Sequence, residues 1–259
     1  MTWQEYELQP MKLGWKYEYW DGHTHISPRH NVVSVSVAVH PRTLPSPCDL
    51  RPVMPTDESA LIAAYIAAYR DTIDFCDWEA ERIEAAARKD IGNFFAGKRG
   101  TPLPASCVAV APHPETGHKI ITGAALIINR EEASPLLDML FVLPQWHRKG
   151  IATAMVSTAL NTLHDSGGEV LASRYALGNE ESRAWHRRFG FIEETDLLLV
   201  RLYYRHAQHE LQRRQRLGDL TEKDREVLSA EYARWQARVE EVEALAEQQG
   251  MEAVLPNPR

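Results

Sequence analysis

The sequence has 259 residues, of which 44% are hydrophobic and 25% are charged, and its formal net charge is −7. This composition is ordinary for a soluble globular chain and excludes collagenous, disordered and disulfide-scaffold classes. The acidic balance argues against nucleic acid as a main partner, because binding phosphates needs a basic surface.

The apolar segments and the cysteine pattern predict a cytoplasmic protein. The apolar runs are too short to cross a bilayer, and the start of the chain lacks a basic segment followed by an apolar one. Cys48, Cys76 and Cys107 are odd in number and lack C-x-x-C spacing, which predicts reduced core thiols. His23 and His25 can share a strand face, but no Cys or acidic residue has matching spacing, so we expect no metal.

Residues 1–47 predict a β-rich extension. Asp21 and Gly22 follow a strand-like segment from Trp15 and carry the turn chemistry of a hairpin. Val32–Val39 alternates apolar and small polar residues, as in a half-buried strand.

Two helices are expected next. Leu50–Val53 is predicted as a short strand, and Thr56 as the N-cap of a helix over about 57–73. A second amphipathic helix should cover about 78–95.

Strands and helices then alternate, which predicts an α/β core. The expected strands are 106–111, 119–129, Leu136–Val142, Val170–Tyr175 and Phe191–Leu202, and the expected helices are Ile151–Asp165 and Glu180–Arg188.

The tail from Tyr204 onward predicts helix. A heptad-like apolar seam is formed by Leu228, Tyr232, Trp235, Val239, Val242 and Ala246. We favour packing of this seam on its own domain. A dimer-forming coil, and hence a homodimer, is the alternative.

The segment around the expected Ile151 helix is the most informative. A buried strand leads through a basic turn into a helix, whose first amides have no internal partner and lie at the positive end of the helix dipole. This arrangement binds anions. Gly150 allows close backbone approach, Ala152 leaves space, and Arg148 and Lys149 add positive charge.

The turn matches a motif of Arg or Gln, two residues, Gly, one residue, and then Gly or Ala. Gly150 and Ala152 match its second and third marked positions, whereas His147 stands at the first. Here the sequence resembles the Gcn5-related N-acetyltransferase (GNAT) superfamily. A second family motif is matched by Asn179, Ser182, Gly190 and Phe191, with His186 at a position where the family commonly has Tyr.

The resemblance covers about residues 48–203 and implies the GNAT fold of the α/β (α+β) class, a mixed, twisted central sheet flanked by helices. Residues 1–47 would be an N-terminal β extension, and 204–259 a C-terminal helical extension. The sheet should splay between the strand ending at Val142 and the strand beginning at Val170.

Acetyl-CoA is the implied co-substrate, with no metal. Its pantetheine arm would lie where the sheet splays and pair with backbone as an added strand does. The residues expected to contact it are Leu140, Phe141, Val142, His147, Arg148, Lys149, Gly150, Ile151, Ala152, Thr153 and Asn179. Asn179 can equally cap a helix.

Two residues are candidates for proton transfer. Strand periodicity puts Asp138 on the face of Leu140 and Val142, where it could act as a base for the amine, or it could bond only a neighbouring loop. His186 could protonate the departing thiolate, or merely pack.

The resulting prediction is an N-acetyltransferase that moves an acetyl or similar acyl group to a primary amine of a small molecule or protein by direct attack. The alternative is a non-catalytic acyl-CoA-binding GNAT-fold interaction module. Asp71, Asp74, Asp77 and Glu79 lie near the expected acceptor side and indicate a cationic acceptor, although such residues also cap and solvate helix ends. The acidic total charge disfavours a toxin acting on aminoacyl-tRNA.

Overall fold

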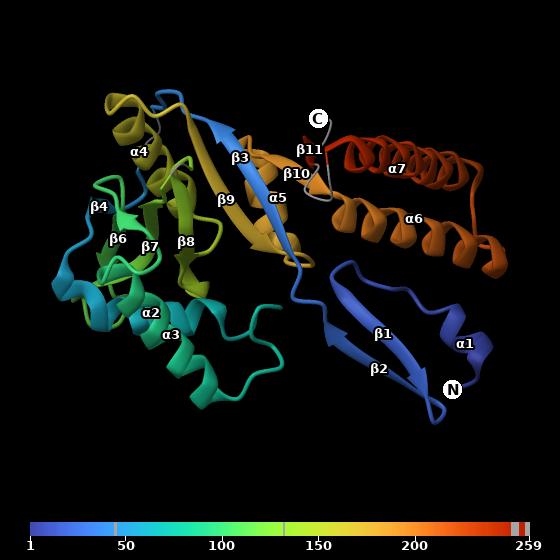
Figure 1. Cartoon of the computed structure of the whole chain (residues 1–259). Helices are drawn as coiled ribbons and strands as arrows, with labels where there is room; N and C mark the ends of the chain where they lie inside the picture. Colours follow the sequence, from blue (N-terminus) through green and yellow to red (C-terminus); the bar gives the residue numbers. More distant parts are fainter. Residues whose placement is uncertain (44–45, 132, 250–253, 257–259) are drawn as a thin grey trace. The chain divides into compact units, whose positions relative to one another are not determined.

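The computed structural model describes residues 1–43, 46–131, 133–249 and 254–256 (Figure 1). The chain forms two compact units. Unit 1 comprises Met1–Ser34, Tyr175–Trp185 and Ile192–Arg259, and unit 2 comprises Val35–Arg174 and His186–Phe191.

Unit 2 is built on a mixed sheet. Its strands are β3 (Val32–Ala38, of which 32–34 belong to unit 1), β4 (Asp49–Pro52), β5 (Thr101–Pro102), β6 (Cys107–Pro112), β7 (Lys119–Asn129), β8 (Leu136–Val142) and β9 (Val170–Ala176, of which 175–176 belong to unit 1). They lie in the order β3-β9-β8-β7-β6-β4, with β5 beside β7. Strands β8 and β9 are parallel, whereas the pairs β4 with β6, β6 with β7 and β7 with β8 are antiparallel. The mixed sheet predicted from the sequence is confirmed.

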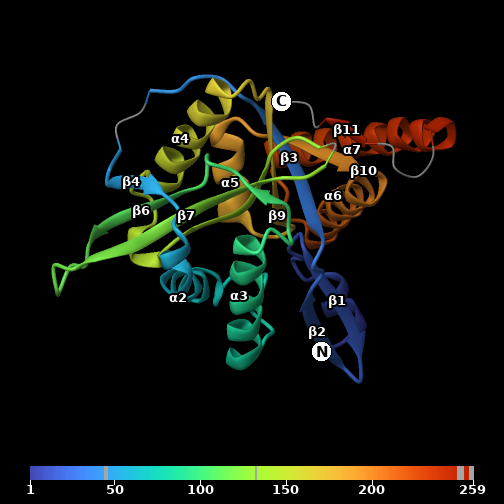
Figure 2. The same ribbon diagram turned by 60° about the vertical axis from the view of Figure 1, so that its left-hand side comes forward.

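Helices cover both faces of this sheet (Figure 2). A 3₁₀ turn (η1, Pro55–Asp57), α2 (Glu58–Tyr69) and α3 (Ala80–Phe95) lie on one face, and α4 (Ile151–Asp165) lies on the other. The α2 and α3 face holds a hydrophobic core cluster, in which Leu61, Ile91 and Phe94 pack with strand residues such as Leu126 and Phe141. Burial of these side chains is the main force that fixes the two helices on the sheet.

Thr56 is not the N-cap of α2, contrary to expectation. The first turn is 3₁₀, and the Asp57 carboxylate accepts the Met54 N–H at 2.9 Å. The Arg51 guanidinium donates to both Asp57 oxygens, at 2.7 and 2.8 Å. This bidentate bond lowers the pKa of the Asp57 carboxyl and locks β4 to the start of α2.

Unit 1 contains the predicted hairpin. It is formed by β1 (Trp15–Trp20) and β2 (His23–Pro28), joined by Asp21 (φ 50°) and Gly22 (φ 74°). Two successive residues with positive φ form the mirror-image turn that suits strand twist, as the Asp-Gly pair predicts. The remaining elements are α1 (Trp3–Glu7), α5 (Glu180–Phe189, shared with unit 2), β10 (Ile192–Asp196), α6 (Leu197–Leu217), α7 (Glu222–Gln249) and β11 (Val254–Pro256).

The predicted strand over Phe191–Leu202 is wrong beyond Asp196. The Asp196 carboxylate accepts the Leu199 N–H at 2.7 Å and so caps a helix that begins at Leu197. In this helix Leu197, Leu199 and Val200 are buried while Leu198 is exposed, which is helical periodicity. A short apolar run cannot by itself distinguish a strand from a buried helix.

The seam of the tail packs within the chain, as favoured from the sequence. The Trp235 ring of α7 stacks on Tyr203 of α6 with centroids 4.4 Å apart, and the hydroxyls of Tyr204 and Tyr232 are 3.1 Å apart. Trp235 and Val242 are buried in this helical hairpin.

Only one of the three cysteines is the buried core thiol expected. Cys107 is buried, Cys48 is half-buried, and Cys76 is exposed beyond the end of α2. All three are free thiols.

Candidate cofactor-binding site

The site lies where β8 and β9 separate (Figure 1). They pair at Leu136 with Ala172 and at Leu137 with Ser173, and the pairing stops there. The remainder of β8 therefore keeps β7 as its partner on one side only. The expected splay after this point is present.

Backbone groups of Leu140 and Val142 form the edge of β8 that faces away from β7, called here the open edge. The Leu143 N–H donates to Thr122 O in β7 at 2.8 Å, and alternation along the strand turns Leu140 and Val142 the other way. Phe141, opposite Ala124, belongs to the paired side.

Both carbonyls of the open edge have side-chain partners. The Tyr69 hydroxyl donates to Leu140 O at 3.1 Å, and His147 Nε2 lies 2.9 Å from Val142 O. Because a carbonyl only accepts, His147 must carry a proton on Nε2 in this contact. The Leu140 and Val142 amides lie on the same edge and point where a ligand can pair with them.

The loop after β8 turns sharply into α4. Trp146 packs against the core, and the Lys149 ammonium lies 4.4 Å from its ring centroid. Arg148 (φ 61°) and Gly150 (φ 79°) both take the left-handed conformation, which is costly for Arg. His147, Arg148, Lys149 and Gly150 are exposed.

The beginning of α4 is suited to an anion. Gly150 occupies the N-cap and supplies no side-chain acceptor, and the first turn has no acidic residue. The ladder starts with Ala154 N–H donating to Gly150 O at 2.9 Å. Ile151 is buried, and Ala152 and Thr153 are half-buried. The helix dipole and the charges of Arg148 and Lys149 therefore act on the same exposed point.

Asp138 does not lie on the face expected from strand periodicity. Leu126 pairs with Met139 and Ile127 with Leu137, so Asp138 is the extra residue of a β-bulge. Its side chain points toward the α3 face and is only 3% exposed.

Arg99, which no pattern in the sequence marks, holds the Asp138 carboxylate. Its Nε and Nη2 donate to the two Asp138 oxygens at 2.5 and 3.0 Å, and its Nη1 donates to Asp90 at 2.9 Å. The Tyr65 hydroxyl also donates to Asp90, at 3.2 Å, which ties α2 to α3. Asp138 is thus a member of a fixed ion-pair network.

His186 is buried at 4% exposure, close to the last β9 residue that pairs with β8. Its Nε2 lies 3.0 Å from Ser173 Oγ, and its ring packs edge-on against Phe191 with centroids 4.9 Å apart. No pattern in the sequence marks Ser173 as this partner, because the contact depends on strand register.

Asn179 belongs to unit 1, where its Oδ1 accepts the Ser182 N–H at 3.0 Å. This bond is the helix-capping contact considered from the sequence.

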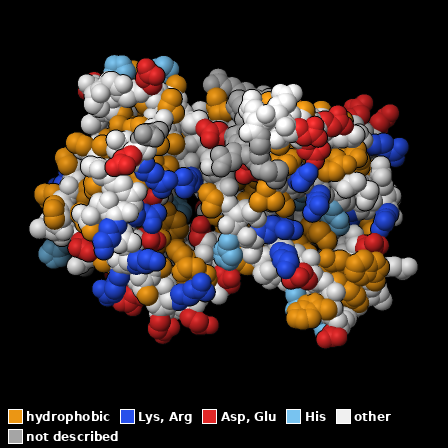
Figure 3. All heavy atoms as spheres, in the orientation of Figure 1, with side chains coloured by type: hydrophobic (Ala, Val, Ile, Leu, Met, Phe, Trp, Pro, Cys, Tyr) orange, Lys and Arg blue, Asp and Glu red, His pale blue; other side chains and the backbone are white. Residues whose placement is uncertain are grey.

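The predicted acidic group lies in the segment that follows α2. Asp71, Asp77 and Glu79 are exposed, whereas Asp74 is half-buried and accepts from the Thr72 hydroxyl at 3.2 Å. On the face drawn in Figure 3, basic and acidic side chains are intermixed over α2 and α3.

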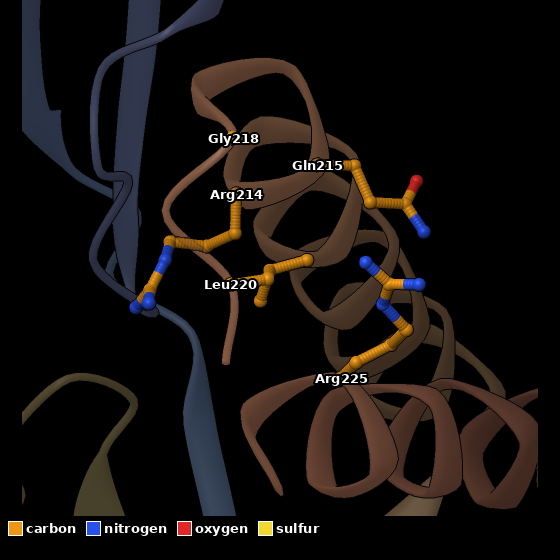
Figure 4. A pocket seen from close by; sticks show the side chains of 5 residues that line it. All are labelled: Arg214, Gln215, Gly218, Leu220 and Arg225. Atoms are coloured by element: carbon orange, nitrogen blue, oxygen red, sulfur yellow. The ribbon is translucent and has the colours of Figure 1, made fainter. Parts of the chain in front are cut away.

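A separate pocket of about 340 Å³ lies in unit 1 at the turn between α6 and α7. Arg214, Gln215, Gly218, Leu220 and Arg225 line it (Figure 4). The Arg214 guanidinium points away from Gln215 and Arg225 and donates to Asp219 at 2.7 Å. This pocket holds none of the predicted site residues.

Among the described residues, no three His, Cys, Asp or Glu side chains gather in a way that could hold a metal ion. In the same part of the chain, no helix has the length and apolarity needed to span a bilayer.

Comparison with known proteins gives a family match for part of the chain. Residues 104–193 match the family model described as an acetyltransferase (GNAT) domain. No curated protein matches the sequence significantly.

Several solved structures are similar at low identity. A GCN5-related N-acetyltransferase from Sphaerobacter thermophilus is 19% identical over 62% of this chain, with a TM-score of 0.42, and the match spans 48% of that protein's length. PaiA N-acetyltransferase from Thermoplasma acidophilum, solved with coenzyme A, is 16% identical over 57% of this chain and 91% of its own, with a TM-score of 0.46. Aminoglycoside 6'-N-acetyltransferase AAC(6')-Ig from Acinetobacter haemolyticus is 17% identical over 55% and 90%, with a TM-score of 0.39.

Proposed function

We propose that this protein is an N-acetyltransferase that transfers the acetyl group of acetyl-CoA to a primary amine, since residues 104–193 match the GNAT acetyltransferase family model. The observation that carries the proposal is the continuous segment from the open edge of β8 to the uncapped start of α4. Its two ends match the two chemically different parts of coenzyme A.

The diphosphate is assigned to the beginning of α4. The amides of Ile151 and Ala152 would bind its oxygens, with Thr153 in the same turn, assisted by the side chains of Arg148 and Lys149. The left-handed Gly150 keeps this approach free of a Cβ atom.

The pantetheine arm is assigned to the open edge of β8, where it would pair with Leu140 and Val142 as an added strand. An amide of this edge would also stabilise the oxyanion that forms on the thioester carbonyl. The amine lone pair attacks the carbonyl carbon, the C–N bond forms and the C–S bond breaks with its electron pair passing to sulfur. One amine proton is lost and the sulfur gains one, so no covalent enzyme intermediate is needed.

Asp138 and His186 are our proposed groups for these proton transfers. Each Asp138 oxygen accepts one hydrogen bond from Arg99 and retains a further lone pair. That lone pair can accept from a water that receives the amine proton. His186, held by Ser173, would supply the proton for sulfur.

A cationic acceptor is our further assignment for this site. The carboxylates of Asp71, Asp74, Asp77 and Glu79 lie in the segment that follows α2. In addition, the two carboxylates of Asp138 and Asp90 share the single guanidinium of Arg99. This balance favours a polyamine, an aminoglycoside or a basic peptide over an anionic amine.

Calorimetry with acetyl-CoA and CoA, followed by thiol release in the presence of an amine panel, tests the proposal. Binding with release that depends on an amine supports an acetyltransferase. Tight binding without release from any amine would instead support the interaction module, and no binding would refute both.

A further inference from the structure

Tyr69 is the side chain that reaches the open edge of β8 from the acceptor side. It is the last residue of α2, and its hydroxyl donates to Leu140 O at 3.1 Å. No signal in the sequence singled it out, since Tyr69 and Leu140 are 71 residues apart.

The Tyr69 ring is fixed by its neighbours. Its centroid lies 4.6 Å from that of Tyr65, and 6.1 Å from those of both Phe75 and Phe141. Phe141 lies next to Leu140 on β8, so the ring is packed against the strand whose edge its hydroxyl contacts. The phenol oxygen is therefore held in place before any ligand binds, which lowers the cost of ordering it.

The hydroxyl has a defined hydrogen-bonding role. Its single proton is used by Leu140 O, and the oxygen can still accept a bond. Burial, followed by the charges of Asp74 and Asp138, raises the pKa of Tyr69, so the hydroxyl keeps its proton at neutral pH. A group that can only accept further bonds selects a ligand that donates.

We propose that Tyr69 is a further catalytic residue, whose oxygen accepts an N–H of the acceptor amine beside the Leu140 amide. This inference rests on the proposed function, because the Leu140 edge is where the thioester is assigned. A neutral amine that donates one N–H to Tyr69 keeps its lone pair free for the carbonyl carbon. Tyr69 starts and ends the turnover protonated, and the released proton follows the path given above.

The chemistry defines the substrate class at this position. An N–H donor satisfies the Tyr69 oxygen, whereas a carboxylate or phosphate would present only acceptors to it. The nearby carboxylates of Asp74 and Asp138 add repulsion against such anions. An acceptor with an acidic group next to its amine should therefore be a poor substrate.

Tyr69→Phe in the full chain tests this inference, with spermidine, kanamycin and a lysine-containing peptide as amines. Losing this contact should lower kcat/KM for the best of these amines about 10- to 100-fold, the usual effect of leaving polar groups unpaired. Affinity for acetyl-CoA, measured by calorimetry, should change by less than about twofold, because the ligand's diphosphate and strand contacts remain.

Tyr65→Phe is the matched control. Tyr65 belongs to the same helix and ring cluster, but its hydroxyl donates to Asp90 at 3.2 Å and not to the strand edge. Its kcat/KM should stay within about twofold of the unsubstituted protein.

Three outcomes would overturn the role of Tyr69 while leaving the acetyltransferase intact. These are an unchanged kcat/KM in Tyr69→Phe, an equal loss in Tyr65→Phe, and a loss explained wholly by weaker acetyl-CoA binding. Failure of the unsubstituted protein to acetylate any amine would instead reject the proposed function, and this inference with it.

Discussion

Two glycines at opposite ends of α4 allow an effect of substitution on diphosphate binding to be distinguished from an effect on backbone strain. Gly150 precedes the helix and Gly167 follows it, and both have a φ of 79°. Apart from the adjoining residues of the chain, a Cβ atom added at either position would meet no protein atom within 4 Å. The substitutions Gly150→Ala and Gly167→Ala therefore place the same group in the same backbone conformation without a clash.

The expected loss of stability is the same for both variants. A left-handed conformation costs an L-residue about 1–2 kcal/mol, and the stiffer unfolded chain returns about 0.4–1 kcal/mol. The net loss of about 1 kcal/mol should lower Tm by about 2–4 °C in a protein of this size. Thermal unfolding followed by circular dichroism measures this shift.

Affinity for coenzyme A should separate the two variants. Only the Cβ at position 150 would lie beside the amides of Ile151 and Ala152, to which the diphosphate is assigned. We expect Kd for CoA to rise at least about tenfold, or about 1.4 kcal/mol, in Gly150→Ala, and to stay unchanged in Gly167→Ala. Equal CoA affinities of the two variants in calorimetry, together with equal Tm shifts, would refute the cradle at the start of α4.

Three further predictions concern charged and buried groups. Asp138→Asn should cost about 2 kcal/mol of unfolding free energy in urea, because Arg99 loses its bidentate partner, and should lower kcat about 100-fold; a stability loss with unchanged kcat would leave Asp138 a purely structural role. His186→Phe should lower kcat about 100-fold, and unchanged turnover and pH profile would reject His186 as the acid. The Arg51 bond lowers the pKa of Asp57 in the folded state, so its stabilisation is present above the unfolded value of about 3.9 and is lost as pH falls through the folded pKa. Urea unfolding of Asp57→Asn should therefore lack this acid-side loss, and an acid limb identical to that of the unsubstituted protein would contradict the assignment.

The segment from β8 to α4 was predictable because its signals are local. The bounds of β8 (Leu136–Val142) and α4 (Ile151–Asp165) agree with those expected from the sequence. Pro144 ends the apolar strand, Gly150 permits the left-handed turn, and Gly167 ends the helix in a second left-handed position.

The surroundings of Asp138 were not predictable in this way. Its side-chain direction depends on a bulge, which arises from how β8 pairs with β7 and leaves no mark in the alternation of residue types. Its partner Arg99 is 39 residues away in the sequence. The strand predicted for the apolar run from Leu197 is wrong for a related reason. Four apolar residues fit a strand or a buried helix equally, and the Asp196 cap favours the helix.

The predictable and unpredictable residues belong to two different parts of the candidate site. The parts assigned to coenzyme A use backbone amides, at a strand edge and a helix start, and neighbouring residues of one segment supply both. The acceptor side uses side chains, and Tyr69, Arg99 and Asp138 meet only because α2, the loop after α3 and β8 fold together. A site made of backbone amides should keep its ligand contacts when a side chain differs, as at His147, provided that the turn keeps its conformation. On the acceptor side, replacing one side chain removes a contact. If the proposed function is right, the identity of the amine would therefore depend on contacts between residues far apart in the sequence, and substitutions at Tyr69 should alter acceptor use before they alter binding of the acetyl donor.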